Sequence, residues 1–177
     1  MAENNNSNRM TSKVDGRTLI LERVFDAPRN LVFSAYSTSE NLAAWWGPEG
    51  WETKNHRFEF VPGGVWHYCM RCIDKDQGEY YGQESCGKAV FHEITAPEKI
   101  VYTDYFSDAD GNAVEGMPEM VVTVEFEEQG GKTNLISKCE FSSIENLQKV
   151  VEMGAKEGFN SQLNKLDDFL KEHQLRS

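Results

Sequence analysis

The sequence of 177 residues predicts an α+β domain in which a curved, seven-stranded antiparallel sheet wraps around a long C-terminal helix. Seven segments carry strand signals, and short turns connect most of them. Short turns favour antiparallel hairpins because parallel strands need long crossover connections. The last thirty or so residues instead repeat apolar positions at helical spacing. Residues 1–16 are rich in Asn and Ser, so we expect a disordered tail there and one domain over residues 17–173.

The first strand and two short helices are predicted between residues 18 and 45. Apolar and charged residues alternate over Thr18–Phe25, which is typical of a half-buried strand. Pro28 is well placed to open a helix over Arg29–Tyr36. A second helix is expected over Ser39–Trp45, where Ser and Thr side chains can cap its first turn.

Six further strands are predicted to form an antiparallel meander, with the first strand at its edge. They are expected at about Thr53–Phe60, Val65–Asp74, Glu79–Ile94, Ile100–Phe106, Glu119–Glu127 and Thr133–Phe141. Gly82 and Gly87 interrupt the longest of them, which favours a β-bulge within that segment.

One amphipathic helix is predicted from about Ser142 to His173. Its apolar or small positions are Leu147, Val150, Val151, Gly154, Ala155, Gly158, Phe159, Leu163, Leu166, Phe169 and Leu170. Ser142 and Glu145 have the spacing of a capping box. Gly154 and Gly158 lie one turn apart in the apolar stripe, which indicates either close packing of the helix on a strand or space for a ligand beside it.

Charge and hydropathy narrow the classes of function. The net charge of −11 and the pI near 4.8 argue against nucleic acid and anionic membranes as partners, since both attract basic surfaces. No apolar run reaches the roughly 18 residues of a membrane span, and the first residues lack the apolar centre of a signal peptide. We therefore expect a cytoplasmic protein.

The cysteines and one acidic loop are the candidate metal sites of the sequence. Cys69 and Cys72 form a CxxC within a predicted strand, where their offset points them to opposite faces. Four irregularly spaced cysteines also do not make the framework of a secreted disulfide-rich protein. The DADGN sequence at residues 108–112 resembles half of a calcium loop but lacks the later ligands, so a mobile loop is expected. We predict neither a metal nor a cofactor.

Several stretches carry a resemblance to a known family. In chain order they are RVFDAPRNLVFSAYSTSENLAAWWGPEGW, the FVPGG turn with Trp66, Tyr68, Met70 and Arg71 after it, HEITAPEKIVYTDYF, VTVEFEEQGGKTNLI and EGFNSQLNKLDDFL. Over about residues 19–170 the chain resembles bacterial homologues of the activator of the 90-kDa heat-shock chaperone ATPase, in the START-like (SRPBCC, birch-pollen-allergen-type) superfamily. The resemblance implies a helix-grip fold, in which the long helix and the concave sheet enclose an elongated, mainly apolar cavity.

The predicted binding residues lie where that cavity is expected. The stretch from Trp45 to Trp51 places three tryptophans around a Gly-Pro loop, either at an edge of the core or at the mouth of a site. The family's strand pattern implies that Trp66, Tyr68 and Met70 point inward. The predicted ligand-binding residues are Trp45, Trp46, Trp51, Trp66, Tyr68, Met70, Tyr81, Tyr102, Met120, Gly154, Gly158 and Phe159.

Three functions remain open at this point. The favoured one is non-enzymatic binding or sequestration of a small hydrophobic molecule, lipid-like or aromatic. A polyketide cyclase or lyase is an alternative, and it needs a polar group such as Tyr68, Tyr81, Tyr102 or Glu84 in the cavity with a perturbed pKa. No catalytic set is predicted, because His67 alternates with Trp66 and Tyr68 and should face away from them. The third function is interaction with a chaperone through an outer surface, and the oligomeric state is left open.

Overall fold

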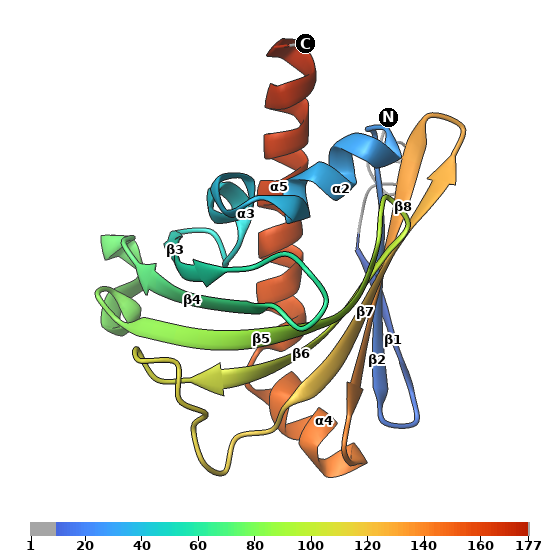
Figure 1. Cartoon of the computed structure of the whole chain (residues 1–177). Coiled ribbons are helices and arrows are strands. Elements are labelled where there is room, and N and C mark those ends of the chain that lie inside the picture. The colour runs from blue at the N-terminus through green and yellow to red at the C-terminus, as the bar shows by residue number, and fades with distance from the viewer. Residues whose placement is uncertain (1–9, 177) are drawn as a thin grey trace.

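The computed structural model describes residues 10–176 and shows a curved antiparallel sheet with a long helix running across its concave side (Figure 1). The sheet has eight strands in the order β1-β2-β8-β7-β6-β5-β4-β3. The strands are β1 Thr11–Asp15, β2 Thr18–Phe25, β3 Trp51–Phe58, β4 Val65–Cys72, β5 Glu84–Thr95, β6 Lys99–Ser107, β7 Met120–Gln129 and β8 Lys132–Phe141. The helices are α2 Arg29–Ser37, α3 Ser39–Trp45, α4 Ile144–Glu152 and α5 Ala155–Arg176, with a 3₁₀ helix, η1, at Lys75–Tyr80.

The sheet has one strand more than predicted. This strand, β1, occupies part of the segment that was predicted to be a disordered tail. β1 lies within residues 1–16, pairs antiparallel with β2 and turns at Gly16, whose φ is +62°. All five residues of β1 are exposed, so the strand has no buried face and leaves no apolar alternation in the sequence. Backbone pairing with the edge of β2 holds it instead. Residues 1–9 of the predicted tail lie outside the described residues.

Most other predicted elements agree with the structure. β5 begins at Glu84, later than predicted, because η1 and a turn occupy the residues before it. The bulge expected in this segment is present, between Phe91 and Glu93 where β5 pairs with β6. The strand predicted first, β2, pairs with β8 and so lies at the edge of the meander as expected.

The predicted C-terminal helix is two helices. α4 ends at Glu152 and α5 begins at Ala155, and Gly154 between them has a φ of +93°, a conformation that favours glycine. The N-cap is Ser143, whose hydroxyl accepts a hydrogen bond from the backbone of Asn146, so the predicted cap at Ser142 was wrong by one residue. In Figure 1, α4 lies at one end of α5, away from α2 and α3.

Aromatic side chains fill the concave side of the sheet near α2 and α3. Trp45 and Trp66 are almost fully buried, and both indole N–H groups are satisfied, by the Ala35 carbonyl at 2.9 Å and by Asn55 Oδ1 at 2.8 Å. The Trp46 ring packs edge-to-face on Trp66, with centroids 4.7 Å apart. Close, hydrogen-bonded packing of this kind leaves little free volume in this half of the interior.

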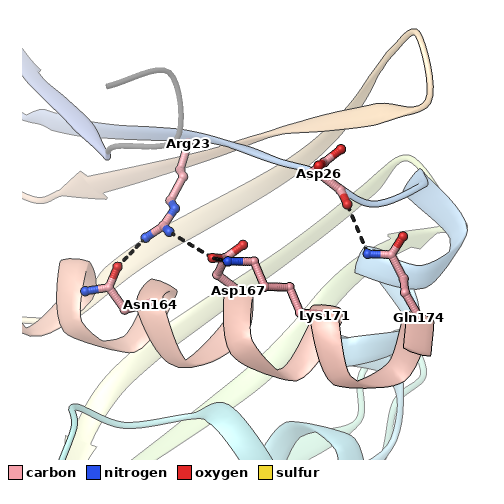
Figure 2. A network of polar contacts seen from close by, with 6 residues as sticks. All are labelled: Arg23, Asp26, Asn164, Asp167, Lys171 and Gln174. Atoms are coloured by element: carbon pink, nitrogen blue, oxygen red, sulfur yellow. Dashed lines mark hydrogen bonds and ion pairs between the residues drawn. The ribbon is translucent and has the colours of Figure 1, made fainter. Parts of the chain in front are cut away.

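A polar network fastens α5 to β2 (Figure 2). The buried Arg23 donates to Asn164 Oδ1 at 2.7 Å and lies 3.7 Å from Asp167 Oδ2. Lys171 approaches the same oxygen of Asp167 at 3.0 Å. Near the end of α5, Gln174 donates to the backbone carbonyl of Asp26. These contacts hold α5 against β2 and the residue that follows it.

Candidate functional site

A small pocket lies on the concave side of the sheet at the α4 end. Its volume is about 70 Å³. The apolar part of its lining comes from β4, β6, β7, β8, α4 and the loop before β7, and consists of Met70, Phe106, Pro118, Met120, Phe141 and Val150. The remaining lining residues are Tyr68, Ser85, Cys86, Gly87, Asp104 and Tyr105.

Tyr68 and Asp104 form the polar centre of this pocket. The Tyr68 hydroxyl lies 3.2 and 3.3 Å from the two carboxylate oxygens of Asp104 and donates to them. The backbone N–H of Tyr105 also donates to this carboxylate. Gly87 faces the phenol, and a Cβ there would clash with the Tyr68 hydroxyl. Glycine at position 87 is therefore what allows Tyr68 to reach Asp104.

The surroundings of Asp104 favour its protonated form. Desolvation raises the pKa of Asp104 to about 7, although the hydrogen bonds from Tyr68 and Tyr105 act in the opposite direction. Burial, and next the negative charge of Asp104, raise the pKa of Tyr68 and of Tyr102 well above the ordinary value. Both phenols therefore stay protonated at neutral pH, while Asp104 changes its charge there.

Three of the predicted binding residues, Tyr68, Met70 and Met120, line the pocket. Four others, Trp45, Trp46, Trp66 and Tyr102, lie in the filled core. Trp51 is half-buried and its indole N–H donates to Gln77 Oε1 at 3.1 Å, whereas Tyr81 is 49% exposed.

The other three predicted residues, Gly154, Gly158 and Phe159, lie at the start of α5 outside the pocket lining. A Cβ at Gly158 would meet nothing within 4 Å, so the interpretation of close helix-on-strand packing is wrong for this residue. Gly154 serves the junction between α4 and α5. Phe159 is half-buried and packs against the core cluster. A ligand contact for the nine predicted residues outside the lining stays a prediction.

Asp104 is the main residue that sequence reasoning missed. It follows Ile100 and Tyr102 at alternate positions of β6, and both of those side chains are buried. An acidic residue in the inward register of an otherwise apolar strand was the available signal. Phe106, Phe141 and Val150 were also missed, since only the tertiary structure brings their three elements together.

The outer face of β4 and β5 holds the other polar candidates. His67 faces away from the pocket, as predicted, and its ring lies 5.1 Å from that of His56. Cys69 is opposite Cys86 in the register and forms a disulfide with it, a pairing that the sequence analysis did not predict. Glu84 lies close to both sulfur atoms.

In the DADGN loop, the Asp108 carboxylate accepts hydrogen bonds from the backbone of Asp110 and Asn112.

A family model described as "Activator of Hsp90 ATPase homolog 1-like protein" matches residues 26–171 of the chain. A comparison with curated proteins finds no match. Within the described residues 10–176, no helix has both the length and the apolar content needed to cross a membrane.

Solved structures similar to this chain come from several bacteria. A solution structure of a protein from Arthrobacter aurescens is 28% identical, with a TM-score of 0.83 over 92% of this chain and 91% of the other. A protein from Staphylococcus epidermidis is 31% identical, with a TM-score of 0.77 over 93% and 95%. A protein from Silicibacter pomeroyi described as AHSA1 is 26% identical, with a TM-score of 0.67 over 90% and 99%.

Proposed function

The chain belongs to the family of activator of Hsp90 ATPase homolog 1-like proteins, and within that family we propose that it binds a small, mainly apolar molecule in the pocket beside α4. The observation that carries this proposal is the pocket itself, an apolar lining around one hydrogen-bonded polar pair. Ligand sites in proteins commonly combine a hydrophobic wall with a few placed polar groups.

The size of the pocket limits the part of a ligand that it accepts. Its volume of about 70 Å³ is well below the roughly 300–1,000 Å³ of sites for drug-sized ligands. A compact group, such as one aromatic ring, is therefore the part that enters. Of α4, only Leu147 and Val150 are buried, and Gly154 joins it to α5, so a small displacement of α4 would enlarge the pocket at modest cost.

Binding of neutral aromatic probes to the full chain tests the proposal. The protein is labelled at its methionine methyl groups and titrated with benzyl alcohol or indole. Either probe should shift the NMR signals of Met70 and Met120 in a saturable way, because both residues line the pocket. Val150→Trp should abolish the shifts by filling the pocket from α4. Gln148→Trp, an exposed position on the same helix, is the matched control. Absence of saturable shifts in the wild-type protein would contradict the proposal.

Interaction with a chaperone is a second candidate, favoured by a depression on the outer surface. The side chains of Val14 and Ile144 are each 51% exposed and lie in this depression. Leu147, Gln148, Val151 and Glu152 complete its lining. Exposed apolar side chains gathered in one depression suit a protein partner.

The chaperone candidate has a test independent of the pocket. The wild-type chain should stimulate the ATPase of a bacterial 90-kDa heat-shock chaperone. Ile144→Asp should remove the stimulation, and Val150→Trp should preserve it, because Val150 faces the pocket while Ile144 faces solvent. No stimulation by the wild-type chain, or equal stimulation by the Ile144→Asp variant, would contradict this candidate.

A further inference from the structure

We propose that the ligand carries a protonated amine on its compact apolar group, and that the ammonium group binds Asp104 inside the pocket. This inference rests on the proposed function, because it names the class of ligand for that same pocket. It starts from the charges of the lining. Of the residues that line the pocket, Asp104 is the only carboxylate, and none is basic.

Within residues 10–174, whose side chains the structure describes, the titratable groups around Asp104 offer it no positive charge. Tyr68 on β4, Tyr102 on β6 itself, Tyr36 on α2 and Cys139 on β8 are the titratable groups coupled to this region. All four are weak acids whose pKa is raised, so they are neutral when Asp104 ionises.

The basic side chains next to the lining of the pocket are also directed elsewhere. Arg71 and Lys88 each follow a lining position of β4 or β5, and alternation turns them to the opposite face of the sheet. Val150 supplies the α4 contact to the pocket, and the preceding Lys149 donates to the carbonyl of Gly116. The positive charge that an ionised Asp104 requires must therefore come with the ligand.

The carboxylate keeps acceptor capacity for such a ligand. An ionised carboxylate offers about four lone-pair sites. The protein supplies one phenol proton, shared between the two oxygens at 3.2 and 3.3 Å, and one backbone N–H. Asp104 is also a lining residue of the pocket, so we expect an ammonium N–H to reach one of its oxygens from inside the pocket.

An ammonium group gains more here than a hydroxyl group does. A hydroxyl offers a neutral hydrogen bond, whereas an ammonium also neutralises the charge that desolvation disfavours. The lining also contains two aromatic residues, Phe106 and Phe141, and aromatic rings attract cations. A ligand carboxylate would be repelled by Asp104, and this excludes fatty-acid-like head groups from this position.

The protonation state of Asp104 makes amine binding depend on pH. The pKa of Asp104 is about 7 in the free protein, and a bound ammonium lowers it. Affinity for an amine that stays protonated should therefore rise as the pH rises, because the ionised fraction of Asp104 rises. Between pH 6 and pH 8 this fraction increases about tenfold, so the affinity should increase by about the same factor.

Calorimetric titration of the full chain with matched probes tests the inference. Benzylamine, benzyl alcohol and benzoate share a ring and differ in charge. At pH 8, benzylamine should bind about tenfold or more tightly than benzyl alcohol, and benzoate more weakly than either. At pH 6 the advantage of benzylamine should shrink about tenfold, while the affinity for benzyl alcohol should stay nearly constant.

Asp104→Asn is the informative variant because asparagine keeps the size of the side chain and an oxygen for the Tyr68 hydroxyl. It should lose both the preference for benzylamine over benzyl alcohol and the pH dependence of that preference. Glu127→Gln removes the same charge from an exposed position and should change neither.

The outcomes separate the two proposals. If benzyl alcohol binds and benzylamine binds no more tightly at pH 8, the pocket function stands and the amine inference is overturned. An amine preference that persists in the Asp104→Asn variant would also overturn it. If neither probe binds, the proposed pocket function is contradicted, and the amine inference that rests on it is overturned as well.

Discussion

The two ends of the concave sheet face differ in what their inward side chains do. Near α2 and α3, large rings such as Trp45, Trp46 and Trp66 interlock and leave the interior filled. Near α4, Met70 and Met120 leave a pocket around a carboxyl group. The strands have the same inward alternation at both ends. Whether an inward position belongs to a packed core or to a binding site therefore depends on its side chain and on the element that covers it.

The helices that cover the two ends also differ in how firmly they are attached to the sheet. At the filled end, α5 is fastened to the sheet by the Arg23 network, with Asn164 and Asp167 as partners (Figure 2). At the pocket end, the short helix α4 is attached through Gly154 and buries only two side chains, Leu147 and Val150. We expect the filled end to carry stability and the pocket end to carry binding, and five substitutions test this division.

The largest effect on stability is expected from Trp66→Ala at the filled end. Removing a ring that is 2% exposed should lower the free energy of unfolding by about 3–5 kcal/mol, and it also leaves Asn55 without its indole partner. Met120→Ala, at the half-buried pocket wall, should cost less than half as much and change probe binding more. Urea unfolding measures both. Equal costs would contradict the division between the two ends.

The next effect concerns Asp104 and pH. Its pKa rises from the ordinary 3.8 to about 7 on folding, so the folded state binds the proton more tightly than the unfolded state. The carboxyl therefore lowers stability progressively from about pH 4 to pH 7, and the full loss is present above pH 7. Asp104→Asn should remove up to about 3 kcal/mol of this loss at pH 8, discounted for partial solvent access.

Unfolding curves of the two proteins at pH 4.5 and pH 8 check this prediction. The stability difference between Asp104→Asn and the wild type should grow in favour of the variant as the pH rises. A difference that is constant with pH would show that Asp104 is not desolvated in the folded protein.

Gly87→Ala should have a smaller effect on stability, with a local signature at the pocket. The new Cβ would meet the Tyr68 hydroxyl, so the phenol must move, at a cost of about 1–3 kcal/mol. Loss of its hydrogen bond should raise the pKa of Asp104 further, because that bond favours the ionised form. NMR titration of the Asp104 carboxyl carbon measures the shift. An unchanged pKa would mean that Tyr68 does not tune this group.

The smallest effect is expected at Gly158, one turn into α5. A Cβ there meets nothing within 4 Å, and alanine is favoured over glycine inside a helix. Gly158→Ala should therefore stabilise the protein by about 0.5–1 kcal/mol without changing probe binding. Thermal unfolding and the methionine NMR signals report the two quantities. Weaker probe binding in this variant would extend the binding site to α5.

Much of the fold could be predicted from local patterns. Alternation identified β2 and the six strands of the meander, and helical spacing identified the C-terminal helical region. β1 was missed because its five exposed residues carry no apolar alternation. The break at Gly154 was missed because glycine in an apolar stripe fits a packed helix as well as a helix end.

Local alternation was enough to predict where the strands lie, because it is a property of each backbone segment alone. The family resemblance then implied that Tyr68 and Met70 point inward, and both line the pocket, as does the predicted binding residue Met120. The filling of one end by the tryptophans and the contact between Asp104 and Tyr68 near α4 could not be predicted from such patterns. That outcome depends on register between β4, β5 and β6 and on the volume left between distant elements, and neither quantity is encoded in a local pattern.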